Sequence, residues 1–297
     1  MAALSFLALA LCFEAAAQDG GGSAKAQALL ARYTALQSQL AASPLGRPLI
    51  VESTELPGGL RGEVFALIEH PFSQVVQALG RPANWCEILM LHINNRQCEL
   101  GPSPDGAPQL SLSVVRRYDH SVKSAFVLPL LLRIDKAAPD YLAITLHSDS
   151  GPMGTSQHHV MVEAVALPGA PQQTFLHFSY GYQHNALARM ASQAYLSTFG
   201  HYKVGFTVVD QTSGSDPDYI RGLRGLVERN AVRYFLTVDA YLDAMGAPPA
   251  RQPEQRLKNW YAATARYPRQ LHEVAQETYL ALKRADRAGA VAGAAKP

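Results

Sequence analysis

The sequence of 297 residues predicts an α+β fold in which an antiparallel sheet is combined with a long C-terminal helix and with extra helices at both ends. Two observations support this fold class. Between residues 92 and 183, six segments rich in β-branched and apolar residues alternate with short loops that contain Gly, Pro and Asp, which is typical of an antiparallel meander. A long segment with helical spacing of apolar residues follows at about 219–245.

The elements before the meander are a helix, a hairpin and two short helices. Apolar residues recur at helical spacing from residue 24 until Ser43-Pro44 ends the helix. Residues 47–56 and 61–70 read as strands joined by a Pro-Gly-Gly turn. Two short helices then follow, one from about Ser73 and one at 83–90.

The meander and the elements after it complete the expected order. The six strands are expected at 92–100, 109–118, 125–135, 140–149, 157–167 and 174–183. They are followed by a helix at 185–199, an extended piece at 202–209, the long helix at 219–245 and a helical tail at 253–287.

Composition and charge exclude some classes of function. Hydrophobic residues make up 48% of the chain and charged residues 17%, so the chain is globular rather than disordered. The formal net charge is +2 and no run of five Lys or Arg residues occurs, so no nucleic-acid partner is expected.

The first 17 residues are apolar and end in small residues, with Ala15 and Ala17 at the positions that a signal peptidase reads. They predict a signal peptide and a periplasmic or secreted protein. The positively charged start of a signal peptide is missing, so an ordinary N-terminal helix remains the alternative. Each later apolar segment is shorter than a membrane span needs.

Two cysteines, Cys86 and Cys98, remain after removal of a signal peptide that contains Cys12. An even number of cysteines in an exported chain predicts a disulfide, which here would join the end of a helix to the following strand. Two buried free thiols are the alternative if the chain is not exported. Two cysteines and a distant histidine provide too few ligands for zinc, so we expect no metal site and no cofactor.

Several segments resemble a known superfamily. The stretch HPFSQVVQALGRPANWCEIL, with Trp85 near the end of its helix, is similar to the opening of START-like domains. The segments GPMGT, KVGFTV and GLRGLVERNAVRY resemble a group of proteobacterial START-like proteins. The order of elements over 47–246 is that of the START/polyketide-cyclase-like (SRPBCC) superfamily. The resemblance implies a helix-grip fold, with a curved sheet wrapped on the long C-terminal helix.

This resemblance divides the chain into a signal peptide (1–17), a linker and helix (18–46), a START-like domain (47–246) and a helical C-terminal extension (247–297). It implies a hydrophobic cavity between sheet and helix, and binding or transfer of a lipid or other apolar ligand. An enzyme that acts in the same cavity, of cyclase, dehydratase or hydrolase type, is the alternative. A structural interaction module is a third possibility if side chains fill the cavity.

The long helix supplies most of the candidate ligand-binding residues. Asn230 and Tyr234 interrupt an apolar stripe on one face, so an amide and a phenol would point at a ligand. Alternatively, the sheet backbone or nearby charges satisfy both. The charged residues Arg224, Glu228, Arg229 and Arg233 are expected to form a solvated or salt-bridged rim. The full set of ligand-binding candidates is Val227, Asn230, Tyr234 and Tyr241 on this helix, with His177 and Trp85.

His177 is the candidate base of the enzyme alternative. Period-two alternation places it with Phe175 on one face of its strand and places Phe178 and Tyr180 on the other, but does not show which face lines the cavity. The motifs of the main enzyme classes (GxSxG, GxxxxGK[ST], GxGxxG and HExxH) are missing, so we assign no catalytic residue.

Other histidines are weaker candidates. The neighbours His158 and His159 point to opposite faces of one strand and cannot bind one metal together. His147 and Asp149 share a strand face, a pairing that we attribute to chance.

The tail at 253–287 is amphipathic, with aromatic residues beside several Lys and Arg residues. We expect it to dock against the outer surface of the domain. Transient contact with an anionic membrane surface is the alternative.

Overall fold

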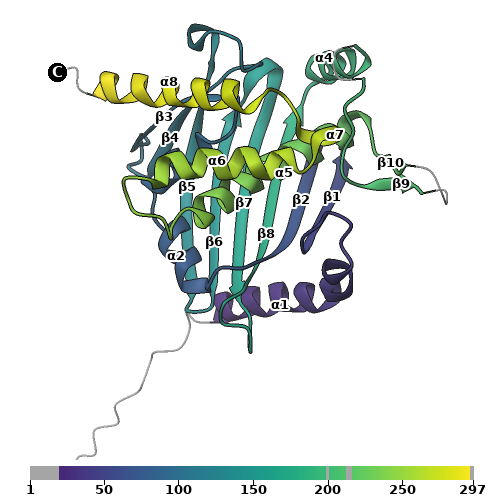
Figure 1. Ribbon diagram of the computed structural model, residues 1–297, viewed down its shortest axis with the longest axis vertical. Coiled ribbons are helices and arrows are strands. Elements are labelled where there is room, and N and C mark those ends of the chain that lie inside the picture. Colours follow the sequence, from purple (N-terminus) through teal and green to yellow (C-terminus); the bar gives the residue numbers. More distant parts are fainter. Residues whose placement is uncertain (1–19, 199–200, 212–215, 295–297) are drawn as a thin grey trace, which may run out of the picture.

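A computed structural model describes residues 20–198, 201–211 and 216–294. Its centre is an eight-stranded antiparallel sheet in the order β1-β2-β8-β7-β6-β5-β4-β3 (Figure 1). The strands are β1 (Leu49–Leu56), β2 (Gly59–Ile68), β3 (Asn95–Pro102), β4 (Pro108–Val114), β5 (Phe126–Ala138), β6 (Tyr141–Ser150), β7 (Thr155–Ala166) and β8 (Thr174–His184). Strands β3 to β8 pair consecutively, which confirms the predicted meander.

The helices follow the predicted order. They are α1 (Gly20–Ala41), α2 (Phe72–Leu79), α3 (Asn84–Leu89), α4 (Ala186–Ser197), α5 (Gly222–Asp243), α6 (Gln252–Ala265), α7 (Pro268–Leu271) and α8 (Gln276–Ala294). Two short helical turns, η1 (Val122–Ser124) and η2 (Pro152–Gly154), and a small sheet of β9 (Val208–Asp210) and β10 (Asp218–Tyr219) complete the description. The tail predicted at 253–287 is three helices, and α8 continues to Ala294.

Helices cover both faces of the sheet. Helix α5 packs on β1, β2 and β8, and its approach to β2 requires a glycine, because a Cβ on Gly62 would lie 2.8 Å from the Val227 carbonyl oxygen. Helix α1 covers the other face, where Leu29 and Leu36 pack against Phe65 and Phe175. A curved sheet that grips the long helix α5 is the helix-grip fold.

The two layers settle the orientation of β8. Leu176 and Phe178 belong to the core under α5, whereas Phe175 belongs to the core under α1. The period-two alternation therefore sends Tyr180 and Tyr182 toward α5 and His177 toward the α1 side.

The C-terminal tail docks against the domain as predicted. Helix α6 packs along α5, and α8 lies beside β3 (Figure 1). The buried Trp260 donates its indole N–H to the Arg233 carbonyl at 3.2 Å, and the buried Tyr279 donates its hydroxyl to the Leu91 carbonyl at 2.8 Å. The aromatic face that a membrane contact would use is therefore packed inside the protein.

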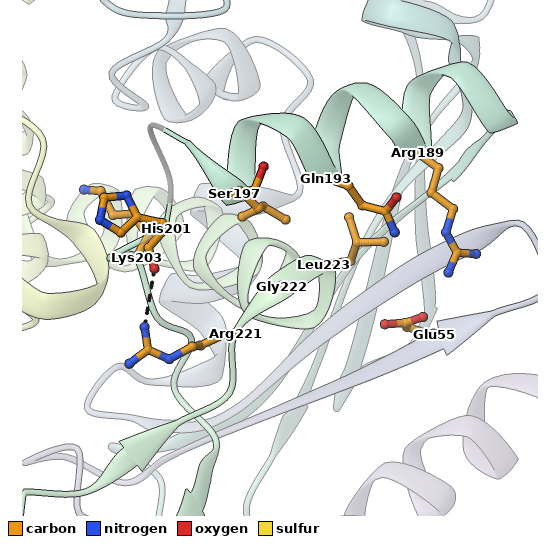
Figure 2. Close-up of a pocket in the computed structure, with 10 residues that line it drawn as sticks. Glu55, Arg189, Gln193, Ser197, His201, Lys203, Arg221, Gly222 and Leu223 are labelled. Carbon is orange, nitrogen blue, oxygen red and sulfur yellow. Dashed lines mark hydrogen bonds between the residues drawn. The ribbon is translucent and has the colours of Figure 1, made fainter.

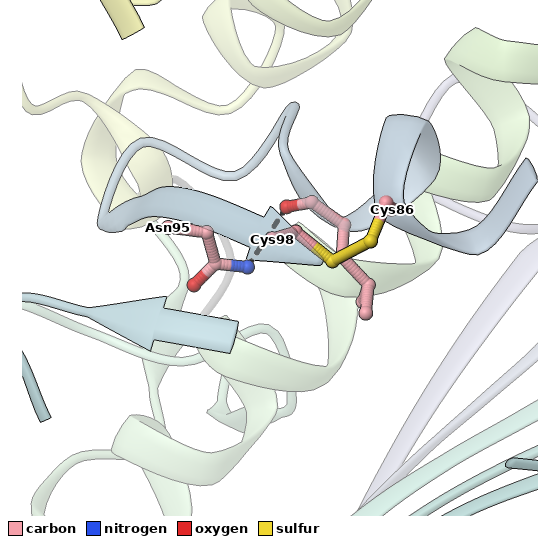
Figure 3. Close-up of a disulfide and its surroundings, with 4 residues drawn as sticks. Cys86, Asn95 and Cys98 are labelled. Carbon is pink, nitrogen blue, oxygen red and sulfur yellow. Dashed lines mark hydrogen bonds between the residues drawn. A yellow bond between two sulfur atoms is a disulfide. The ribbon is translucent and has the colours of Figure 1, made fainter. Parts of the chain in front are cut away.

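The disulfide prediction is confirmed. Cys86 on α3 and Cys98 on β3 are bonded, with their Cα atoms 5.4 Å apart (Figure 3). The buried amide of Asn95 donates to the Leu89 carbonyl at 2.8 Å and ties the same two elements together. The predicted signal peptide lies outside the described residues. Among those that are described, no helix is both long enough and apolar enough to cross a membrane.

The alternative of a solvated rim on α5 is wrong for three of its four residues, whereas the alternative of a salt bridge holds for Arg233, which pairs with Glu273. Glu228, Arg229 and Arg233 are buried, because the segment around Phe206 and the C-terminal tail cover that side of the helix. The carboxylate of Glu228 accepts hydrogen bonds from the N–H groups of Phe206 (2.6 Å) and Thr207 (2.9 Å). It also accepts from the hydroxyls of Thr207 (2.7 Å) and Ser53 (2.6 Å).

Candidate functional site

An aromatic surface lines the concave side of the sheet opposite α5. Tyr180 and Tyr182 of β8 have ring centroids 5.9 Å apart, and Tyr180 lies 5.5 Å from Tyr234 of α5. The ring of His92, in the turn before β3, stacks on Tyr234 at 4.5 Å. We call Tyr180, Tyr182, Tyr234 and Asn230, which lies one turn before Tyr234, the concave surface.

The polar groups of the concave surface are largely unpaired within the protein. Tyr234 makes a long hydrogen bond of 3.5 Å to the Asn95 side-chain oxygen. Within the described ranges, the phenols of Tyr180 and Tyr182 and the amide of Asn230 have no hydrogen-bond partner, and Tyr180, Asn230 and Tyr234 are only partly buried.

Burial raises the pKa of Tyr234 and of Tyr182 to about 12, and it raises the pKa of Tyr180 as well. The phenols therefore stay neutral at ordinary pH. Each can donate a hydrogen bond to a hydroxyl or carbonyl oxygen of a ligand.

A pocket of about 430 Å³ opens at the end of this surface, between α4, the end of β1 and the start of α5 (Figure 2). Its lining residues are Glu55, Arg189, Gln193, Leu196, Ser197, His201, Lys203, Arg221, Gly222 and Leu223. We call it the rim pocket. Leu196 and Leu223 form its apolar wall and pack in one cluster with Leu60, Tyr182 and Val227. The wall of the rim pocket is therefore continuous with the concave surface.

Cationic side chains dominate the polar part of the rim pocket. Arg189, Lys203 and Arg221 line the rim pocket together with one carboxylate, that of Glu55. Arg221 donates to the His201 carbonyl at 3.4 Å, which leaves part of its guanidinium group for other acceptors. No partner of the Arg189 side chain is found in the part of the chain that the structure describes.

The structure brings only three of the six predicted ligand-binding residues together. Val227, Asn230 and Tyr234 lie on neighbouring turns of α5, and they include the polar pair expected to interrupt the apolar stripe. Trp85 is fully buried and donates its indole N–H to the Leu79 carbonyl at 2.9 Å, so it supports the α2–α3 corner. Tyr241 is covered by Arg256 of α6, whose guanidinium carbon lies 3.9 Å from the ring centre.

His177 lies on the opposite face of the sheet from the concave surface and is 8% exposed. Its ring stacks on Phe65 at 4.4 Å between two carboxylates. Nδ1 is 2.9 Å from Glu163 and Nε2 is 3.0 Å from Glu63. Burial alone would lower the pKa of His177, but the hydrogen bonds that its ring donates to both carboxylates, and their negative charges, outweigh burial and raise the pKa. The sheet separates His177 from Asn230 and Tyr234, so the three do not form one site.

Two of the other histidines, His158 and His147, also have local partners. His158 faces the concave side, stacks on Tyr182 at 5.5 Å and contacts the Thr155 hydroxyl at 2.8 Å, and burial lowers its pKa to about 4. His147 and Asp149 do form a pair at 3.0 Å, but Asp149 is exposed on the surface. Among the side chains described, no group of three or more His, Cys, Asp or Glu is placed to hold a metal ion.

Sequence reasoning missed the rim pocket. Its residues come from the end of β1, from α4, from the segment that follows α4 and from the start of α5. Such a set has no common spacing, so no local pattern predicts it. Leu196 does not stand out either, because Leu187 and Met190 on the same helix are also apolar, and only the structure shows that these two are exposed.

No family model matches the sequence, and no curated protein matches it either. Solved structures resemble it in part. Norcoclaurine synthase from Thalictrum flavum is 9% identical with a TM-score of 0.32, over 52% of this chain and 77% of that chain. Human StAR-related lipid transfer protein 5 is 13% identical with a TM-score of 0.32, over 61% of this chain and 89% of that chain.

A conserved protein from Geobacillus kaustophilus is 12% identical with a TM-score of 0.31, over 48% of this chain and 85% of that chain. Likeness at this level decides neither ligand nor activity. The fold assignment rests on the order of strands and on the position of α5.

Proposed function

We propose that the protein binds or transfers a lipid or other hydrophobic ligand, which enters through the rim pocket and lies against the concave surface. The observation that carries this proposal is the set of unpaired phenol and amide groups of Tyr180, Tyr182 and Asn230, joined to an apolar-walled opening. Tyr180 and Asn230 are only partly buried, so a polar atom of a ligand can reach these groups and pair with them.

The chemistry of the two regions fits an apolar chain. Leu196 and Leu223 offer aliphatic contact at the entrance, and the tyrosine rings offer apolar faces farther in. Each buried CH₂ group contributes about 0.8 kcal/mol, so a chain of about ten carbons supplies about 8 kcal/mol before the cost of ordering it is subtracted. The tyrosine hydroxyls and the Asn230 amide would orient a polar atom of the ligand.

We further propose that this binding takes place in an oxidising compartment such as the bacterial periplasm. The Cys86–Cys98 disulfide and the apolar residues 1–17 support it. In the enzyme alternative, His177 was the candidate for the catalytic base. With His177 on the other face of the sheet, we propose no reaction.

The first test is native mass spectrometry of the purified protein, followed by solvent extraction. We expect a co-purifying apolar molecule, or uptake of an added one such as oleyl alcohol. Protein that stays empty after incubation with oleyl alcohol would contradict the proposal.

Two substitutions on α4 distinguish ligand entry through the rim pocket from binding at the outer surface of the helix. Leu196→Trp places an indole in the wall of the rim pocket, and we expect it to reduce oleyl alcohol uptake at least about tenfold, because the added ring occupies the entrance. Leu187→Trp is the matched control on the same helix, since Leu187 is 72% exposed. Equal uptake by the two variants would show that the rim pocket is not the entrance.

A further inference from the structure

We propose that the rim pocket binds an anionic group, a carboxylate or a phosphate, and that the ligand is therefore an anionic amphiphile. This inference rests on the proposed function and names the class of its ligand. The anionic group would sit at the rim near the start of α5, between Arg189 and Arg221, which lie at opposite ends of the pocket (Figure 2), and the apolar part would pass Leu196 and Leu223 toward Tyr182.

The charges of the rim pocket favour an anion. The guanidinium group of Arg189 has no partner in the described chain, and Figure 2 shows it pointing into the pocket toward Glu55. Arg221 is held only weakly, by Asp218 at 3.6 Å and by the His201 carbonyl at 3.4 Å. Both guanidinium groups therefore keep N–H donors for a carboxylate or phosphate, which arginine binds in a bidentate manner.

Lys203 adds a fixed positive charge to the wall. It is 6% exposed, and its ammonium group is held by the His272 carbonyl at 2.5 Å and by Glu273 at 3.6 Å. Burial lowers the pKa of Lys203 from its ordinary value, with Glu273 opposing that effect. Lys203 and Arg221 also line a second pocket of about 330 Å³, together with Arg269 and His272. Glu273 lines this second pocket as well, so its charge is mixed.

The start of α5 adds donors of its own. Gly222 and Leu223 line the rim pocket, and Gly222 adopts a φ of +67° that turns the chain into the helix. The backbone N–H groups of Gly222, Leu223 and Arg224 have no acceptor within the described ranges, and Arg221 at the N-cap supplies none. These N–H groups and the helix dipole reinforce the arginines.

The test compares two probes that share one chain. Oleate carries a carboxylate and oleyl alcohol does not, and isothermal titration calorimetry measures both. We expect the wild-type protein to prefer oleate by about tenfold or more, as charge-assisted hydrogen bonds imply. Arg189→Gln and Arg221→Gln should each weaken oleate binding more than oleyl alcohol binding and so reduce this preference. Arg116→Gln, at an exposed arginine outside the pocket, is the matched control.

The outcomes separate the inference from the proposed function. Equal affinity of the wild-type protein for both probes would overturn the anion site and leave hydrophobic binding in place. A preference for oleate that survives in both variants would also overturn it. Binding of neither probe would count against the proposed function.

A second measurement tests the anion site without an apolar chain. Inorganic phosphate and octyl phosphate are titrated while nitrogen–proton correlation NMR follows the amides of Gly222, Leu223 and Arg224. Shifts of these amides with both probes support the anion site, and a higher affinity for octyl phosphate identifies an amphiphile rather than free phosphate. Unchanged amides with both probes would overturn the inference.

Discussion

The buried carboxylate of Glu228 allows a test of how α5 is held against β1 and against the segment around Phe206. It joins α5 to β1 through Ser53 and to the segment that carries Lys203 through Phe206 and Thr207. Two replacements of similar size separate hydrogen bonding from packing. Glu228→Gln keeps an oxygen that can accept from both backbone N–H groups, and the two hydroxyls can rotate to accept from its NH₂ group. Glu228→Leu removes every acceptor.

The magnitude follows from the N–H groups left without a partner. A buried donor that loses its acceptor costs about 1–3 kcal/mol. Glu228→Leu leaves the two N–H groups of Phe206 and Thr207 without an acceptor. We therefore expect this variant to be less stable than Glu228→Gln by about 2–6 kcal/mol. For a protein of this size, about 1 kcal/mol lowers Tm by about 2–4 °C. The two variants should therefore differ in Tm by at least about 4 °C.

Thermal unfolding followed by circular dichroism measures this difference, and amide hydrogen exchange locates it. In Glu228→Leu, the amides of Phe206 and Thr207 should exchange faster than in Glu228→Gln. Glu99→Leu is the control, because Glu99 is exposed and such a change stays within about 0.5 kcal/mol. Equal Tm values for the Leu and Gln variants, with unchanged exchange at the two amides, would refute the reasoning.

Three further predictions test other parts of the fold. Replacing Cys86 and Cys98 with serine should lower the free energy of unfolding by about 3 kcal/mol, measured by urea denaturation, because the disulfide closes a loop of about 13 residues. No change would mean that the bond does not form in solution. A raised His177 pKa contributes stability below the ordinary value of about 6.5, and this contribution is lost as pH rises through the folded-state pKa. The Tm difference between wild type and His177→Gln should therefore be larger at about pH 5.5 than at about pH 9, and a difference independent of pH would contradict it. Deleting residues 247–297 should abolish folding, measured by circular dichroism and limited proteolysis. The deletion removes buried side chains such as Trp260, Leu271 and Tyr279, worth about 1.5–3 kcal/mol each, from a total stability of about 5–15 kcal/mol. A folded truncated domain would show that the tail is dispensable.

The sequence was sufficient for the order of elements because each strand and helix has a local signature. Alternating apolar residues and Gly-Pro loops predict the meander, and helical spacing predicts α5. The disulfide was predictable from cysteine count and compartment. The orientation of β8 was not predictable, because alternation defines two faces of the strand without showing which of them faces α5. That choice depends on α1, which covers Phe65 and Phe175 from the other side.

Burial of the charged residues on α5 was not predictable for a related reason. Glu228 and Arg233 have the spacing of exposed residues, and the groups that cover them are distant in sequence. Glu228 meets Phe206 and Arg233 meets Glu273, both brought in by loops and by the tail. The rim pocket was unpredictable for the same reason. Arg189 and Arg221 are distant in sequence, and they line one pocket only because α4 packs against the start of α5.

The bonds along α5 explain why a ligand would enter at the start of this helix rather than at its end. Near the C-terminal end, Arg47 makes two hydrogen bonds to Asp239, at 2.6 and 2.9 Å. His70 contacts Asp243 at 2.9 Å, and α2 and α3 fill the space between the helix and the sheet. Opening this end would break several bonds and disturb the core. At the other end, α4 covers the entrance with Leu196 directed inward and Leu187 exposed, and the rim pocket already lies beneath it. We therefore expect a ligand to enter beside α4 rather than at the C-terminal end of α5.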